Sequence, residues 1–101
     1  MKRESDRYYT AMELLKQYRH ADEEQAASMQ SALEIMRNHH KHGGMYYWIL
    51  YYSFLSPTAC ENDQVVLTIL LAHNFGVTKR NFYGRRRAAV YAFSECFLGY
   101  R

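Results

Sequence analysis

The fold depends most on the sequence Ala72-His-Asn-Phe-Gly-Val-Thr-Lys-Arg-Asn-Phe82, which has the residue order of a tight turn between two helices. Gly76 takes a left-handed backbone conformation without the steric penalty of a Cβ atom, as the position after a helix end requires. Phe75 and Val77 flank this glycine and are expected to enter the core. Thr78 supplies a hydroxyl that caps the next helix. The order of these residues predicts a helix-turn-helix unit.

The first helix of this unit is predicted to follow a short link over residues 58–61. Asn62 or Asp63 can cap it. Its apolar residues recur at helical spacing and are expected to face the core: Val66, Leu67, Leu70 and Leu71. Ala72 lies four residues before the glycine. Its small side chain is expected to let the two helices cross closely.

The second helix is projected over residues 78–98, and its two sides differ in chemistry. One side holds the helix to the domain through Phe82, Ala89 and Phe93, with Cys96 and Phe97 close behind. The opposite side is polar and basic, and it carries Arg80, Gly84, Arg87 and Tyr91, flanked by Asn81 and Tyr83. Such a face suits the major groove of DNA, where Arg pairs with guanine, Asn pairs with adenine and other cations meet phosphates.

The predicted DNA-binding residues lie at the start of this helix: Thr78, Lys79, Arg80, Asn81, Tyr83, Gly84, Arg85, Arg86 and Arg87. Lys79, Arg80, Asn81 and Tyr83 are expected to contact bases or the DNA backbone. Arg85 and Arg86 project near the edge of the core, so their guanidinium groups are expected to reach outward and contact phosphates. Gly84 is unfavourable inside a helix, and it either leaves room for DNA or kinks the helix near Tyr83. The alternative interpretation is that this basic face is only exposed to solvent and does not bind DNA.

Positive charge gathers in the same part of the chain. The formal net charge is +3, but from Thr78 onward six basic residues stand against Glu95 alone. The first 77 residues carry seven basic and nine acidic side chains. Attraction to phosphate requires such a local concentration of positive charge.

Residues 5–42 are predicted to form an N-terminal helical hairpin. Its first helix is capped by Ser5 or Asp6 and has one apolar face: Tyr8, Met12, Leu15 and Tyr18. The pattern lapses after Arg19 and resumes in a second helix that Asp22 caps, with Ala26, Met29, Leu33 and Met36 on its apolar face. Gly43 and Gly44 then release the chain. One long bent helix is the alternative, because neither Gly nor Pro interrupts residues 1–42.

Residues 45–101 are predicted to form the part that contains the helix-turn-helix. This part begins with Met45–Leu55, the most hydrophobic element, which we expect to be a central helix ended by Ser56-Pro57. Its aromatic rings suit either of two roles. They can stack on the bases of a single strand, or they can form a core that supports the helix-turn-helix. The second interpretation is the one we favour.

Together these elements predict one all-α domain, residues 1–101, a small helical domain of about five helices with a C-terminal helix-turn-helix. One Pro, five Gly and the absence of a strand-turn-strand pattern favour this class. The longest apolar run has 11 residues, whereas a membrane span needs about 20. We therefore expect a soluble, cytoplasmic protein that does not bind a membrane.

No enzyme, cofactor or metal site is predicted. Phosphate-binding glycine loops, carboxylates paired by helical spacing and nucleophile–base arrangements are missing from the sequence. Cys60 and Cys96 are expected to be reduced thiols. His39, His40 and His42 lack accompanying carboxylates or cysteines at ligand spacing, so we do not expect them to bind a metal. His20 and His73 are isolated and are expected to be solvated.

Several segments resemble the ArpU/RinA-type regulators of late transcription in phages of Gram-positive bacteria. The similar segments are Tyr47–Pro57, Leu71–Thr78, Phe82–Val90 and Phe97–Gly99, with a short N-terminal piece, Leu14–Arg19. In that family the C-terminal half resembles the promoter-reading domain of sigma factors. The resemblance implies sequence-specific DNA binding that activates late genes in a bacterial host cell.

The leading hypothesis is a transcriptional regulator that binds double-stranded DNA, with host RNA polymerase as a further partner. The N-terminal hairpin then dimerises or touches the polymerase, so a homodimer and a monomer both stay open. The alternative is a phage-encoded protein-interaction module or inhibitor that binds a host protein through its helix-turn-helix surface. Salt-sensitive binding to duplex DNA distinguishes the two hypotheses.

Overall fold

The computed structural model describes residues 4–56, 63–73 and 76–98, and these residues form an all-α structure. They contain the α-helices α1 (Glu4–Lys16), α2 (Glu23–His39), α3 (Gly43–Leu50), α4 (Asp63–Ala72) and α5 (Phe82–Leu98). A 3-10 turn, η1 (Tyr18–His20), and a π-helical segment, η2 (Tyr51–Leu55), complete the described elements. The predicted all-α class of about five helices is confirmed. None of these helices is long and apolar enough to cross a membrane.

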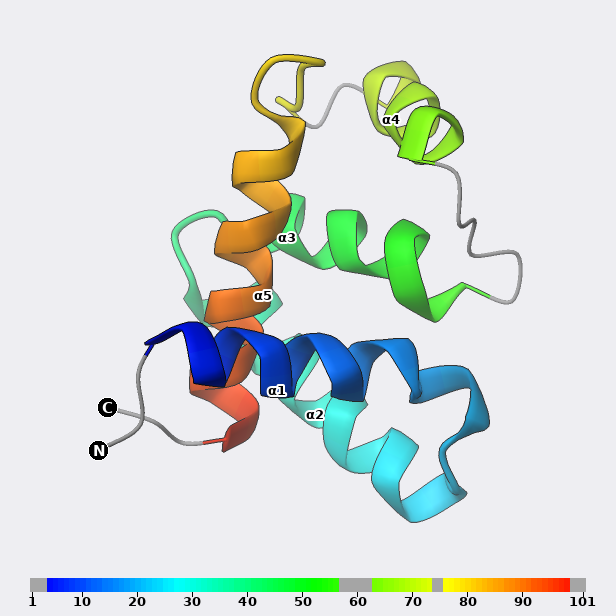
Figure 1. Ribbon diagram of the computed structural model, residues 1–101, viewed down its shortest axis with the longest axis vertical. Helices are drawn as coiled ribbons and strands as arrows, with labels where there is room; N and C mark the ends of the chain where they lie inside the picture. The colour runs from blue at the N-terminus through cyan, green and yellow to red at the C-terminus, as the bar shows by residue number, and fades with distance from the viewer. Residues whose placement is uncertain (1–3, 57–62, 74–75, 99–101) are drawn as a thin grey trace.

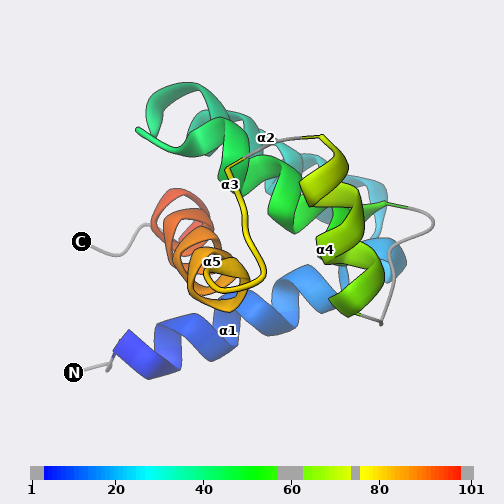
Figure 2. The same cartoon turned by 90° about the horizontal axis from the view of Figure 1, so that it is seen from above.

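Helix α5 is in the middle of the molecule and packs against α1, α2 and α3 (Figure 1). The side chains that make these contacts are fully or almost fully buried: Ala89, Val90, Ala92 and Phe93. Helix α4 packs mainly on α3 and η2. Figure 2 shows α4 and α5 as separate helices, joined by the segment that precedes α5.

The core consists of two clusters, and α3 contributes to both. The larger cluster joins α1, α2, α3 and α5 and includes Leu50. The smaller cluster contains Ile49 of α3 together with Val66, Leu67, Leu70, Val77 and Phe82. The aromatic segment therefore supports the start of α5 on one side and the rest of the domain on the other, which agrees with the core role predicted for it.

Helices α1 and α2 are separate, as predicted, and η1 lies between them in the chain. The cap of α2 is confirmed, because Asp22 Oδ1 accepts a hydrogen bond of 2.8 Å from the Gln25 N–H. The predicted cap of α1 is wrong: the helix already begins at Glu4, so Ser5 and Asp6 lie inside its first turn. The predicted apolar face of α1 is present, with Leu15 fully buried.

The sequence predicts that the two glycines after α2 release the chain. This prediction is wrong, because both glycines belong to the first turn of α3. A Cβ atom at Gly43 would collide with the carbonyl oxygens of Met36 and Arg37. A Cβ atom at Gly44 would meet no heavy atom within 4 Å. Glycine at the first of these positions allows α3 to start directly against the last turn of α2.

The aromatic helix changes its hydrogen-bond pattern halfway along its length. In η2 the Ser56 N–H donates to the Tyr51 carbonyl, five residues earlier, at 2.9 Å. Segments of this kind are rare and short. The helical conformation ends before Ser56 as predicted, while Pro57 lies outside the described residues.

Helix α4 differs from its prediction on one side. Val66, Leu67 and Leu70 are buried as expected, but Leu71 is 49% exposed and Ala72 is exposed. The close crossing expected at Ala72 is absent because α4 packs mainly on α3 and η2. The predicted link and the Asn62 cap lie outside the described residues, as does Phe75.

Candidate nucleic-acid interface

The turn before α5 has the backbone geometry that its sequence predicts. Gly76 has a φ of +80°, in the left-handed region, and Val77 is buried with 3% exposure. Thr78 Oγ1 accepts a hydrogen bond of 3.2 Å from the Asn81 N–H. In return, Asn81 Oδ1 accepts a hydrogen bond of 2.7 Å from the Thr78 N–H. This reciprocal pair is a capping box in which Asn takes the usual place of Glu or Gln.

The second helix starts later than predicted. The sequence favours a helix directly after Thr78, whereas α5 begins at Phe82. Residues 79–81 form a turn closed by the hydrogen bond from the Asn81 N–H to the Thr78 carbonyl, at 3.2 Å. Asn81 draws the chain into this turn because its side chain bonds to the backbone of Thr78, which competes with helical pairing. Lys79 and Arg80 consequently lie on the turn, ahead of the helix.

The predicted buried side of α5 is confirmed. Phe82, Ala89 and Phe93 have 1%, 0% and 0% exposure, respectively. Cys96 and Phe97 are half-buried, as expected for residues close behind this side. The ring of Phe97 stacks on that of Phe93, with centroids 5.4 Å apart. The helical phase deduced from the sequence is therefore correct, although the first residue of the helix is not.

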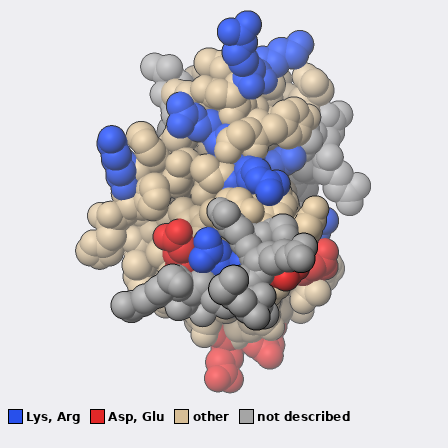
Figure 3. All heavy atoms as spheres, turned by 60° about the vertical axis from the view of Figure 1, so that its left-hand side comes forward, with Lys and Arg blue, Asp and Glu red and all other residues tan. Residues whose placement is uncertain are grey.

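The opposite side of the turn and helix is exposed and basic. Its exposed residues include Thr78, Lys79, Arg80, Tyr83, Gly84 and Arg87. On the face drawn in Figure 3, Lys and Arg extend from the top of the molecule past its middle, whereas Asp and Glu gather in the lower half. A surface of this kind attracts anions.

Arg85 and Arg86 are half-buried at the edge of the core, as the helical projection predicts. The guanidinium carbon of Arg86 is 5.0 Å from the centroid of the Phe82 ring and 5.3 Å from that of Tyr83. Arg85 Nε is buried and has no hydrogen-bond partner in the described part of the chain. The aliphatic parts of both side chains therefore pack on the helix surface. Contacts between their guanidinium groups and phosphates stay a prediction.

The side chain of Arg87 contacts two aromatic rings, and neither contact was predicted from the sequence. Its guanidinium carbon lies 4.5 Å from the Tyr8 ring centroid and 5.5 Å from that of Tyr91. Its Nη2 donates a hydrogen bond of 3.3 Å to the Tyr91 hydroxyl. The spacing of four residues could have indicated the Tyr91 contact. No local signal indicates Tyr8, which lies on α1.

Gly84 lies in the first turn of α5, and the helix runs through it to Leu98 without being split. A Cβ atom at this position would meet no heavy atom within 4 Å. The protein itself therefore does not require a glycine here. The helix is therefore not split at Gly84, and the other explanation, space for the close approach of DNA, stays a prediction.

Asn81 differs from the other predicted contact residues because its side chain already has two partners. Its Oδ1 accepts from the Thr78 N–H, and its Nδ2 lies 3.5 Å from the Gly76 carbonyl oxygen. The amide thus ties together both ends of the turn. This arrangement gives Asn81 a structural role, whether or not it also contacts DNA.

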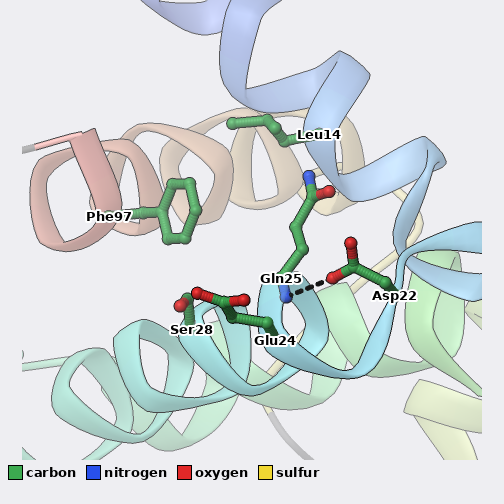
Figure 4. Close-up of a pocket in the computed structure, with 6 residues that line it drawn as sticks. All are labelled: Leu14, Asp22, Glu24, Gln25, Ser28 and Phe97. Atoms are coloured by element: carbon green, nitrogen blue, oxygen red, sulfur yellow. Dashed lines mark hydrogen bonds between the residues drawn. The ribbon is translucent and has the colours of Figure 1, made fainter.

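The described residues contain a hollow at the other end of α5, shown in Figure 4. Its volume is 380 Å³, and it is lined by Leu14, Asp22, Glu24, Gln25, Ser28 and Phe97. Two carboxylates border an apolar floor, so the hollow has the wrong charge for a phosphate.

Two further groups considered from the sequence are the Cys96 thiol and the histidines near the end of α2. Burial, with a smaller contribution from the negative charge of Glu95, raises the pKa of the Cys96 thiol. The thiolate is the nucleophilic form, so this environment makes the thiol less reactive. Within the described ranges, no group of three or more His, Cys, Asp or Glu residues could hold a metal ion. His40 instead packs on the ring of Tyr46, with centroids 5.0 Å apart.

No known protein family, curated protein or solved structure matches the chain. The resemblance to the ArpU/RinA-type regulators therefore rests on the similar sequence segments alone. The candidate interface rests on the turn geometry, the exposed basic residues and the burial pattern of α5.

Proposed function

We propose that this chain is a sequence-specific, double-stranded DNA-binding transcriptional regulator. In this proposal α4, the segment that links it to α5, and α5 act as the helix-turn-helix, and the start of α5 enters the major groove. The observation that carries the proposal is the set of exposed basic residues formed by Lys79 and Arg80 on the turn before α5 and by Arg87 on the exposed side of the helix. Phe82 anchors the helix in the core, so this surface faces outward from a rigid base.

The side chains of this surface divide into two kinds of contact. Arg80 and Lys79 project from the turn just ahead of α5, where a recognition helix meets base edges. An Arg there can bond to guanine with two donors. Arg85, Arg86 and Arg87 lie further along the helix and suit phosphates, which fix the orientation of a protein on DNA. The open space beside Gly84 permits the DNA backbone to approach the helix closely.

Charge separation supports the same orientation. The acidic residues Asp22, Glu23 and Glu24 lie at the start of α2, and two of them line the hollow near the C-terminal end of α5. The basic turn precedes the other end of this helix. A molecule charged in this way presents its basic end to a polyanion.

The ArpU/RinA resemblance extends the proposal to a phage or prophage activator of late genes, with host RNA polymerase as a further partner. Exposed apolar side chains outside the basic surface provide places for protein contacts. Ile35 of α2 is 50% exposed, and Val65 and Leu71 of α4 are 44% and 49% exposed. These residues also favour the second candidate function, a module that binds a host protein.

Selection from a randomised duplex library at two salt concentrations tests the proposal. If about five phosphates are neutralised, a fourfold rise in salt weakens binding by roughly a few hundred-fold. An enriched motif with this salt dependence is the expected result. The matched variants are Arg80→Gln, which is expected to change the motif, and Glu24→Gln, which is expected to leave it intact. Absence of binding at low salt would overturn the proposal and favour the protein-binding module.

A further inference from the structure

One side of α2 is exposed along the helix and carries no charged residue after the first turn. The exposed residues on this side follow helical spacing: Glu24, Ala27, Ser28, Ser31, Ile35 and Asn38. Ile35 is 50% exposed, unlike the other large apolar side chains of α2, which are buried. This side of the helix therefore offers an apolar side chain among small, uncharged neighbours that allow another backbone to come close.

The hollow beside this side of α2 offers a place for an apolar side chain. Glu24 and Ser28 belong to the exposed side and also line the hollow, while Leu14 of α1 and Phe97 of α5 lie across from them (Figure 4). Leu14 and Phe97 form an apolar floor, and the carboxylates of Asp22 and Glu24 form part of the rim. An aliphatic side chain that arrives with positive charge close by fits both parts.

We propose that α2 pairs with α2 of a second copy of this chain, antiparallel and across a two-fold axis, so that Ile35 of each copy covers the hollow of the other. Ala27 and Ile35 lie four residues before and four residues after Ser31. A two-fold pairing centred on Ser31 therefore brings Ile35 of one copy onto Ala27 and Ser28 of the other, at the edge of the hollow. The large side chain meets small ones, as close packing requires.

The charges at the two ends of α2 favour a second copy in this orientation. Glu23 and Glu24 lie in the first turn, and Arg37 and His39 lie in the last turn. Antiparallel pairing places the acidic start of each helix near the basic end of the other, whereas parallel pairing would bring like charges together. The guanidinium carbon of Arg37 is 4.8 Å from the Tyr47 ring centroid, so its charge is positioned within its own copy and acts across the axis without a direct contact.

The pairing leaves the candidate nucleic-acid interface uncovered. The hollow lies near the C-terminal end of α5, where Phe97 lines it, whereas the basic turn precedes Phe82 at the other end of this helix. The inference goes beyond the proposed function and does not depend on it, because association of two copies is measured without DNA.

Analytical ultracentrifugation of the full chain over a series of protein concentrations tests the pairing. The parent is expected to form a dimer and no larger assembly, because a two-fold contact closes on itself. Ile35→Ser is expected to raise the dissociation constant of the dimer by about tenfold or more, since each dimer loses two buried side chains. Leu71→Ser is the matched control, because Leu71 is 49% exposed on α4, and it is expected to leave the constant unchanged. Thermal unfolding checks that both variants are folded.

A charge exchange tests the antiparallel register. Glu24 and Asn38 lie seven residues before and seven residues after Ser31, so the pairing places them opposite each other across the axis. Within one helix they are about 21 Å apart and do not contact each other. Asn38→Glu is expected to weaken the dimer by bringing two carboxylates together, and adding Glu24→Lys to the same chain is expected to restore it.

Each outcome decides for or against the pairing. A dimer that Ile35→Ser weakens and that the charge exchange restores supports it. A parent that stays monomeric up to millimolar concentration overturns it, as does a dimer that Leu71→Ser weakens and folded Ile35→Ser does not. Failure of Glu24→Lys to restore the dimer of Asn38→Glu overturns the antiparallel register. A monomeric parent that binds host RNA polymerase, with loss of this binding in Ile35→Ser, overturns the pairing and assigns this side of α2 to the polymerase.

Discussion

Thr78 and Asn81 cap each other in the turn before α5. The Thr78 hydroxyl accepts from the Asn81 N–H at 3.2 Å, and the Asn81 side-chain oxygen accepts from the Thr78 N–H at 2.7 Å. Two backbone donors that a helix start leaves without partners are satisfied in this way. The pair also fixes the two residues between them, Lys79 and Arg80, which are the first basic residues of the candidate interface.

Removal of either cap is expected to destabilise the turn. Thr78→Ala is predicted to lower the free energy of unfolding by about 1 kcal/mol, because the Asn81 N–H loses the hydroxyl acceptor and keeps only the Thr78 carbonyl. Asn81→Ala is expected to have a similar effect, and the double variant should cost less than the sum because the two bonds depend on each other. Urea unfolding measures these values, with Thr78→Ser as the control that keeps the hydroxyl. Equal stability of parent and Thr78→Ala would contradict the capping role.

The same variants address the role of Asn81 in DNA binding. Its amide already bonds within the turn, so we expect Asn81→Ala to weaken binding without changing the selected motif. Selection from the duplex library with this variant is the measurement. A motif that loses its preference for adenine at one position would instead identify Asn81 as a residue that reads a base.

Phe82 is expected to contribute more to stability than any exposed residue beside it. The side chain is 1% exposed and belongs to the cluster that joins α3, α4 and α5. Phe82→Ala is therefore predicted to lower the free energy of unfolding by about 3–5 kcal/mol. The adjacent Tyr83 is 58% exposed, and Tyr83→Ala is expected to change stability by no more than about 0.5 kcal/mol. If the two variants were equally stable, the helical phase of α5 would be wrong.

Arg87 is expected to couple energetically to Tyr8 across two helices. A cation–π contact at an exposed site contributes about 0.5–1 kcal/mol, and the Arg87–Tyr8 distance of 4.5 Å is within its range. A double-mutant cycle with Arg87→Ala and Tyr8→Leu, followed by urea unfolding, is expected to give a coupling of this size. Arg80→Ala serves as the comparison and is expected to show no coupling to Tyr8→Leu.

Gly84→Ala is predicted to have opposite effects on stability and on DNA binding. The new Cβ atom meets open space, and alanine is the better helix former, so stability is expected to rise by up to about 1 kcal/mol. Under the proposed function the methyl group occupies space used by DNA, so affinity for the selected duplex is expected to fall. Thermal unfolding and duplex titration measure the two effects. A variant that is both more stable and equally tight in binding would exclude close approach of DNA at Gly84.

Local sequence signals predicted the parts of the fold that depend on neighbouring residues. The Asp22 cap, the left-handed Gly76 and the buried phase of α5 each follow from residues within a few positions of one another. These features depend on backbone sterics and on hydrogen bonds between close neighbours, which are independent of the rest of the chain.

The sequence could not predict features that depend on which helices pack together. Leu71 fits the apolar pattern of α4, but it is 49% exposed, because α4 packs mainly on α3 and η2 through its other side. The contact of Arg87 with Tyr8 joins residues on α5 and α1.

The late start of α5 was not predicted either, although its cause is local. Asn81 can either continue a helix or close a turn, and helical propensity alone does not distinguish the two.

Gly43 is expected to be required where α3 begins, whereas the adjacent Gly44 is not. A Cβ atom at Gly43 would collide with the carbonyl oxygens of Met36 and Arg37, and backbone atoms can move aside only if α3 shifts away from α2. Gly43→Ala is therefore predicted to lower the free energy of unfolding by about 1–3 kcal/mol, in the range of other overpacked sites.

Gly44→Ala makes the same chemical change one position later, where the added atom meets nothing within 4 Å. Its stability is expected to equal or exceed that of the parent, because alanine favours the helical conformation. Urea unfolding of the two variants measures the difference. Equal stability of Gly43→Ala and Gly44→Ala would mean that α3 can begin further from α2 without loss of core packing.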